Sequence, residues 1–538
     1  MAQHAPSTIT KRVVDKVTTV LLIACVASLL LSFVLTLFTA RNWPLVGDAA
    51  LMHYVVFLLQ GGHAPYREIV DINLPGSYLL EAASMKLFGT GAIGLRLYDS
   101  FLCLLLCLLF TLFGQVGWRG RVTGLSAGIF FVLIHLQDGF AQAAQREFAM
   151  AVLVVGAYVI LLGRTPGSRL SAIFFFELLI GLSLTIKPTL LPLAALPLLL
   201  PNKREQQPPR NPFQILALAL LGLSVAPASA LLWLWRWHSL RAFASVTRSI
   251  AVLHSQLGRR GLLYLLSHST SPIDTLVIAW LMLTCLVLFA LPRRSHDTHR
   301  VALLFGVLCG LFSYLAQAKG YPYQRYPFLA LLLLWIARDL PASLFHPVSL
   351  FSPATRFGRA DSRIGSRIGS RILALGVVCL ACLWYAPRFA WLTRTFKPEA
   401  PFEQALAMDL RSRHAAQAEV QCLDTFGGCI NTLYDLRLTQ STGYLYDCYL
   451  FTPEGPTQAA YRASFLHAFD EAHPKYIVLT DQFCFDGKTG FDRVGTWQAL
   501  ETRLNNQYTV VSKWHPPYAQ RWWSRSEIPS SYRLYASK

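Results

Sequence analysis

Charge is scarce in this sequence. Only 14% of its 538 residues are charged, whereas soluble globular proteins carry about 25%. Hydrophobic residues make up 54% of the chain, and the mean hydropathy is +0.41. This composition excludes an ordinary soluble protein and predicts an integral membrane protein.

Acidic residues are scarcer than basic ones, at 29 against 48, which gives a formal net charge of +19. The chain lacks the basic stripe with interleaved aromatics that nucleic-acid binding needs, so no nucleic-acid partner is expected. The basic residues instead form short clusters between apolar runs, as the positive-inside rule describes. These clusters are Arg119 and Arg121, Arg164 and Arg169, Lys203 to Arg210, Arg293 to Arg300, and Arg338 to Arg371.

The C-terminal polar region lacks a close C-x-x-C pair and a glycine-rich phosphate loop. Its cysteines are Cys422, Cys429, Cys448 and Cys484. An even number predicts two disulfides in an oxidising compartment, and the missing C-x-x-C pair disfavours a zinc site. Spacing leaves the pairing open, with Cys422–Cys429 as the local option.

Apolar runs long enough to cross a membrane predict about eleven transmembrane helices. Their approximate cores are 17–39, 93–116, 122–140, 149–162, 170–186, 189–200, 213–235, 273–291, 301–317, 324–337 and 372–389. The run 189–200 is punctuated by prolines, which predicts a broken helix. The basic clusters all fall on the side of Lys11 and Arg12, so the N-terminus is predicted to be cytoplasmic. The odd count then places the C-terminal region outside the inner (plasma) membrane.

These patterns predict a polytopic α-helical membrane protein with a small C-terminal extracytoplasmic α/β domain. The predicted boundary separates residues 1–398 from 399–538. Amphipathic stretches at 49–60 and 74–88 predict interfacial helices in the first outer loop. After residue 398, short β-like runs at 476–480, 508–511 and 532–535 alternate with helical patterns at 457–472 and 496–505.

Charged and amide side chains gather at the outer ends of the predicted spans, where ionisable groups mark function. The residues predicted as base or substrate ligands are Asp48, Asp71, Arg146, Glu147, Lys187, Gln317, Lys319 and Arg325. Together with Glu68, which lies in the same loop as Asp48, these eight are predicted to line one outer cavity that carries both signs of charge.

Each of these residues also has a structural explanation. Asp48 suits the cap of a short helix beginning at Ala49, and Glu147 suits a helix N-terminus. Lys187, Lys319 and Arg146 suit side chains that reach to the membrane interface.

Their combination favours chemistry on a lipid phosphosugar. Lysine and arginine can neutralise a phosphate leaving group, while a carboxylate deprotonates an acceptor hydroxyl. Asp48 is the predicted base, and direct displacement inverts the anomeric centre without a protein nucleophile. A second basic stretch, residues 236–272, predicts contact with an anionic lipid head group, and a solvated amphipathic helix is the alternative.

The order of motifs resembles the glycosyltransferase-C superfamily of polytopic transferases that use polyprenyl-phosphate sugars. The matching stretches are Gly47 to Ala49, Asp71 to Leu80, Phe88 to Leu97, Arg146 to Phe148 and Leu184 to Pro188, with Lys319 to Pro327 resembling a later loop. The resemblance implies that Asp48 is the base and that Arg146, Glu147 and Lys187 line the site. It also implies a polyprenyl-phosphate donor and an extracytoplasmic glycan, lipid or protein acceptor.

Two departures from the superfamily pattern bear on mechanism. Many relatives have paired acids after the first helix, whereas Ala49 follows Asp48 here, and a double proline has become Leu74 to Gly76. No cofactor is expected to be required, and the use of a divalent metal stays open. The alternatives are a ligase or polymerase that acts on lipid-linked glycans and, from another class, a transporter or flippase. Charge at the outer face rather than the midplane counts against transport.

Overall fold

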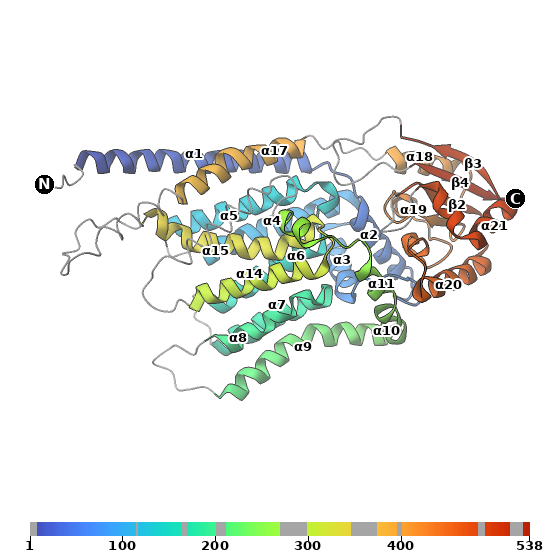
Figure 1. Ribbon diagram of the computed structural model, residues 1–538, viewed down its shortest axis with the longest axis horizontal. Coiled ribbons are helices and arrows are strands. Elements are labelled where there is room, and N and C mark those ends of the chain that lie inside the picture. Colours follow the sequence, from blue (N-terminus) through green and yellow to red (C-terminus); the bar gives the residue numbers. More distant parts are fainter. Residues whose placement is uncertain are drawn as a thin grey trace.

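The computed structural model describes residues 8–114, 117–163, 169–200, 211–269, 298–345, 374–394, 401–482, 490–516 and 531–538. A bundle of roughly aligned helices forms one end of the molecule, and a region containing a β-sheet forms the other (Figure 1). The helix that begins at Thr8 starts at the far end of the bundle from this sheet region. We call the bundle end that meets residues 401–538 the sheet end.

The bundle consists of long apolar helices that follow the predicted runs. They are α1 (Thr8–Ala40), α4 (Gly91–Phe113), α5 (Trp118–Gln137), α6 (Arg146–Leu162), α7 (Arg169–Ile186), α9 (Pro212–Arg236), α14 (Thr298–Gln317), α15 (Tyr326–Phe345) and a helix over Ala374–Arg394 that ends in α17 (Ala386–Arg394). Among the described residues, six helices are long and apolar enough to cross a membrane. The protein is therefore an integral membrane protein.

Two of the predicted spans need comment. The run 189–200 is broken as predicted, because prolines divide it into a 3-10 helix, Pro188–Ala195, and the four-residue α8, Leu196–Leu199. The predicted span 273–291 lies outside the described residues.

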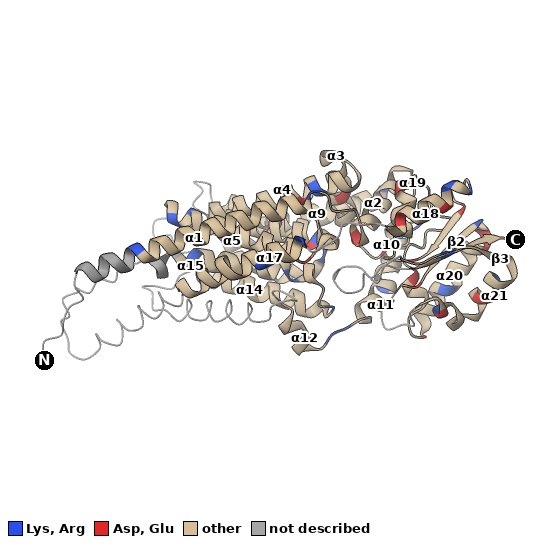
Figure 2. Ribbon diagram, turned by 90° about the horizontal axis from the view of Figure 1, so that it is seen from above, with Lys and Arg blue, Asp and Glu red and all other residues tan. Residues whose placement is uncertain are grey.

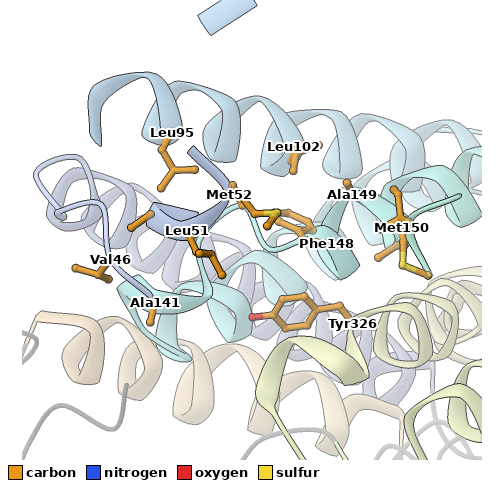
Figure 3. Close-up of a cluster of buried hydrophobic side chains, with 14 of the residues drawn as sticks. Val46, Leu51, Met52, Leu95, Leu102, Ala141, Phe148, Ala149, Met150 and Tyr326 are labelled. Carbon is orange, nitrogen blue, oxygen red and sulfur yellow. The ribbon is translucent and has the colours of Figure 1, made fainter. Parts of the chain in front are cut away.

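The bundle core is a continuous apolar layer in which aromatic rings pack against aliphatic side chains. Leu95, Leu102, Phe148 and Met150 are all buried here, and Tyr326 lies among them (Figure 3). Figure 2 shows the bundle almost free of charged residues, while acidic residues gather at the sheet end and beyond it. The charged side chains that could bind a polar substrate therefore lie mainly at the sheet end.

Short helices cover the sheet end of the bundle. They are α2 (Gly47–Gln60), α3 (Pro75–Phe88), α10 (Leu240–Arg248), α11 (Ile250–Gln256) and α12 (Leu262–Ser267). The helices predicted at 49–60 and 74–88 are present as α2 and α3. However, α2 is not a surface helix, because eight of its residues are buried. Residues 401–538 cover it from the side opposite the bundle (Figure 1).

Residues 401–538 combine helices with a four-stranded mixed sheet, as the alternating pattern predicted. The helices are α18 (Pro401–Ser412), α19 (Cys429–Leu436), α20 (Pro456–Ala472) and α21 (Gln498–Gln507), and the strands are β1 (Val420–Leu423), β2 (Tyr476–Thr480), β3 (Tyr508–Trp514) and β4 (Tyr532–Ser537). The strand order is β1-β2-β4-β3, with β1 parallel to β2 and the other pairs antiparallel.

The predicted disulfides lie in this region. Cys422 and Cys429 form one, which was the local option. Cys448 is also disulfide-bonded, and Cys484 lies outside the described residues.

Backbone-level contacts join residues 401–538 to the first loop of the bundle. The Gln440 amide donates to the Tyr54 hydroxyl at 2.6 Å, and the Val70 amide donates to the Gly443 carbonyl at 2.8 Å. A Cβ on Gly443 would lie 2.1 Å from the Glu68 carbonyl oxygen, so only glycine permits this approach. The C-terminal region is thus fixed directly over α2.

Candidate active site

The site begins at the first turn of α2. Gly47 has φ +58°, a conformation that glycine adopts without cost, and it turns the chain from the Pro44–Val46 segment into the helix. Asp48 lies in the first turn, where a carboxylate is favoured by the helix dipole. Its side chain does not cap the helix, whose N-cap Val46 makes no side-chain bond. The Asp48 carboxylate instead accepts from the Arg146 guanidinium at 3.1 Å.

Arg146, the first residue of α6, joins two stretches of the first loop. Besides Asp48 it donates to Asn73 Oδ1. Asp71 in turn fixes Asn73, because it accepts from Asn73 Nδ2 at 2.8 Å and from the Tyr78 hydroxyl at 2.8 Å. Asp71 is buried, and it orients Asn73, which in turn accepts from Arg146.

A second polar group unites the ends of three bundle helices. Lys187 follows α7, and its ammonium donates to the Glu147 carboxylate of α6 and to Gln317 Oε1 of α14 at 2.6 Å. The Glu147 side chain is only 2% exposed, whereas that of Lys187 is 32% exposed. The ammonium therefore neutralises a buried acid and still reaches solvent.

Lys319, which follows α14, contacts helix α11. Its ammonium donates to the His254 carbonyl at 2.7 Å, and His254 Nδ1 lies 3.0 Å from the Tyr449 hydroxyl. Burial, together with the charges of Lys319, Lys187 and Arg146, lowers the pKa of His254 to about 3. A neutral histidine thus stands beside a cluster of cations.

Asp48 experiences opposing effects. Burial raises its pKa above the ordinary aspartate value, the Arg146 charge lowers it, and the net shift is upward. A carboxylate with a raised pKa accepts a proton more readily, which suits a general base.

Seven of the eight predicted site residues meet at the sheet end. Asp48, Asp71 and Arg146 form one linked group, and Glu147, Lys187 and Gln317 form the next. Lys319 binds the His254 carbonyl, and His254 experiences the charges of Lys319, Lys187 and Arg146. Arg325 lies in the same segment as Lys319 but does not join these groups, because it is fully buried and forms an ion pair with Asp138.

One group of potential metal ligands is found among the described residues. Asp99, Cys103 and His135 place ligand atoms within 4.8 Å of one another. This group lies in α4 and α5, and the Asp99 carboxylate already contacts His135 at 3.0 Å and the Ala144 amide at 2.6 Å. Such a hydrogen-bonded pair is better explained as part of a polar network than as a vacant metal site.

Comparison with solved structures identifies the architecture. ArnT from Cupriavidus metallidurans in the apo state superimposes with a TM-score of 0.55 and 14% identity, covering 95% of this chain and 97% of ArnT. ArnT bound to undecaprenyl phosphate gives a TM-score of 0.53 and 13% identity over the same shares. The chain has the glycosyltransferase-C fold. No protein-family model matches the sequence, and a comparison with curated proteins gives no match.

The fold brings to this site residues to which the sequence patterns assigned no role there. Asn73 and His254 hold Arg146 and Lys319 respectively, and Tyr446 comes from the C-terminal region. Burial and the nearby carboxylates of Asp48 and Asp71 raise the pKa of Tyr446. The only sequence signal for Tyr446 and Tyr449 was their density in the stretch Tyr444 to Leu450, which carries no known motif.

Proposed function

We propose that the protein is an inverting glycosyltransferase that moves a sugar from a polyprenyl-phosphate donor to an extracytoplasmic glycan, lipid or protein acceptor. The observation that carries this proposal is the meeting of Asp48 with Arg146, Lys187 and Lys319 at the sheet end of a glycosyltransferase-C fold. ArnT, which shares the fold, has been crystallised with undecaprenyl phosphate. That lipid has the chemistry of the product that such a donor would release.

The proposed reaction has one displacement step. Asp48 takes the proton of an acceptor hydroxyl, whose oxygen attacks the anomeric carbon as the bond from that carbon to the phosphate oxygen breaks. Lys187, which keeps a solvent-exposed face, and Lys319 hold the phosphate and stabilise the charge that develops on it. Arg146, Glu147, Gln317 and Asp71 set the positions of these groups through the contacts described above.

Membrane placement follows from the same proposal. We infer about eleven spans, a cytoplasmic N-terminus, and a division at residue 398 between the membrane part and an extracytoplasmic α/β domain. Arg119 and Arg121 support this orientation, because both are exposed at the start of α5. That helix end is distant from the sheet end, so the sheet end faces out of the cell in this proposal.

The proposed chemistry requires no cofactor. Arg146 already occupies the Asp48 carboxylate as its cationic partner, and displacement assisted by lysines needs no metal to neutralise the phosphate. Transfer measured with and without a chelator tests this directly. Full activity after exhaustive chelation is the expected result.

Mass spectrometry tests the function itself. Polyprenyl-linked sugars and surface glycans are compared in cells with the protein and in cells that carry Asp48→Asn. We expect a polyprenyl-phosphate sugar to accumulate in the variant and one glycan modification to disappear. Unchanged lipid and glycan profiles would refute the proposal.

A second candidate, a ligase or polymerase that acts on diphosphate-linked glycans, is favoured by one observation. Arg236, Arg241, Arg248, Arg259 and Arg260 are exposed around α10 to α12, and such an array suits a larger anionic group. The released lipid separates the two candidates. A transferase leaves polyprenyl monophosphate, whereas a ligase leaves the diphosphate.

A further inference from the structure

A buried polar chain crosses the bundle beneath the candidate site. It consists of Asp99, His135, Tyr326, Asp138 and Arg325, which we call the relay. Asp99 Oδ1 lies 3.0 Å from His135 Nε2, and His135 Nδ1 lies 3.0 Å from the Tyr326 hydroxyl. That hydroxyl donates to Asp138 Oδ2 at 3.1 Å, and Arg325 completes the chain by donating to both Asp138 oxygens.

The relay stands in apolar surroundings. Figure 3 shows the Tyr326 ring among buried hydrophobic side chains, and its centroid lies 6.0 Å from that of the Phe148 ring. His135 packs against the Phe148 ring with centroids 4.4 Å apart. All five relay residues are at most 5% exposed. Polar groups at such depth are costly unless they are paired, and within the relay every buried side-chain nitrogen and oxygen except Arg325 Nε has a partner.

The hydrogen bond from Tyr326 to Asp138 determines the role of the neighbouring His135 nitrogen. Tyr326 has a single hydroxyl proton and gives it to Asp138, so its oxygen must accept from His135 Nδ1. His135 Nε2 then shares a proton with Asp99 Oδ1, whichever of the two carries it. Hydrogen bonds therefore run from His135 to Tyr326 and from Tyr326 to Asp138. They join the Arg325–Asp138 ion pair to the carboxyl of Asp99.

At its other end the relay holds the turn that enters α6. Asp99 Oδ1 also accepts from the Ala144 backbone amide at 2.6 Å. Ala144 has φ +50°, a left-handed conformation that costs a residue with a Cβ about 1 kcal/mol or more. Arg146 follows two residues later and binds Asp48 and Asn73. The Asp99 bond thus fixes a strained turn directly before a residue that contacts the proposed base.

We propose that Asp99 is a positioning residue for the transfer reaction, acting through the Ala144 amide to hold Arg146 and Glu147 in the site. The relay extends this control to a second loop, because Arg325 belongs to the 3-10 helix Pro322–Arg325, which follows Lys319. The turn before Arg146 and the segment after Lys319 therefore both contact the same buried network. This inference rests on the proposed function in one respect, namely that the site binds a polyprenyl phosphate.

Two readouts on the purified full-length protein test the relay: amide hydrogen exchange over residues 139–147, and binding of undecaprenyl phosphate. In Asp99→Leu, we expect exchange about tenfold faster or more and lipid binding about tenfold weaker or more, because a hydrogen bond to a charged group is lost. Asp99→Asn keeps an Oδ1 acceptor for Ala144 and should remain within about threefold of wild type in both readouts. Wild-type exchange in Asp99→Leu would overturn the proposal.

A matched control lies on the same bundle, far from the site. Asp339 is also fully buried and pairs with Arg300 at 2.8 Å, 13 residues along α15 from Tyr326, which is about 20 Å of helix. Asp339→Leu should lower thermal stability yet leave exchange over 139–147 and lipid binding unchanged. If exchange over residues 139–147 changed in both Asp99→Leu and Asp339→Leu, the cause would be general destabilisation. That result would count against a positioning role for Asp99.

Tyr326→Phe covers the case in which Asp99→Leu does not fold. It removes the hydroxyl that links His135 to Asp138 and leaves the Arg325–Asp138 ion pair and the Asp99–His135 contact in place. His135 then holds Asp99 less firmly, so exchange over 139–147 should rise several-fold. Wild-type exchange and binding in Tyr326→Phe would refute the relay. If the wild type itself does not bind undecaprenyl phosphate while these variants still speed exchange, the proposed function fails and the relay stands.

Discussion

Replacing Asp48 by asparagine tests its proposed role as a base separately from its contact with Arg146. Asparagine keeps the shape of the side chain, and its Oδ1 can still accept from Arg146, which also retains Asn73 as a partner. The positions of Arg146 and the lysines should therefore persist. What is lost is the ability to take a proton.

The size of the loss follows from general-base catalysis. A positioned base contributes about 10²–10⁴-fold, so kcat should fall by that factor, which corresponds to about 2.7–5.4 kcal/mol in activation free energy. The donor KM should change little, because the asparagine removes an interaction with the acceptor proton rather than with the phosphate.

The assay measures release of polyprenyl phosphate from the lipid-linked sugar in membranes. Glu68→Gln is the matched control, because Glu68 is an acid of the same loop whose side chain is 44% exposed and pairs with Arg67. It should retain wild-type turnover. Turnover by Asp48→Asn at the wild-type rate would refute the assignment of the base.

Three further predictions concern the remaining charges and the disulfide. Lys187→Ala should raise the donor KM about tenfold or more, since a charge-assisted bond to the phosphate is lost; an unchanged KM would remove Lys187 from phosphate binding. Because burial raises the pKa of Asp48, kcat should fall as pH drops through a value above about 3.9. Arg146→Gln should move that limb of the pH–rate profile to higher pH, and an unmoved limb would argue against Asp48 as the titrating group. Replacing Cys422 and Cys429 by serine opens a loop with a sequence separation of 7 and should lower the free energy of unfolding of residues 401–538 by about 2.5 kcal/mol; equal denaturation midpoints would contradict this.

Much of the site was predictable because charges at the ends of apolar runs can lie only at the membrane faces. Topology alone therefore brought Glu147, Lys187 and Gln317 to one end of the bundle. The details depended on contacts that no local pattern encodes. Arg325 was predicted beside the substrate, but it pairs with Asp138, which is 187 positions earlier.

Two further features escaped prediction for physical reasons. α2 has an amphipathic pattern typical of a surface helix, yet residues 401–538 bury it through contacts far apart in the sequence. Asp99 and Glu177 are buried within apolar helices. The prediction from sequence considered charges at the ends of the predicted spans and therefore missed both. A single acid in an apolar run gives no indication of its partner.

The glycine contact between the C-terminal region and the first loop has a consequence for protein engineering. Gly443 lies against Glu68, while Asn431 donates to the Leu45 carbonyl at 2.8 Å and Gln440 binds Tyr54. The segments 42–73 and 401–538 therefore form one complementary joint, although the whole bundle separates them along the chain. A chimera that exchanges only the C-terminal region with another glycosyltransferase-C fold would break this joint directly over Asp48. A transplant should carry both segments together.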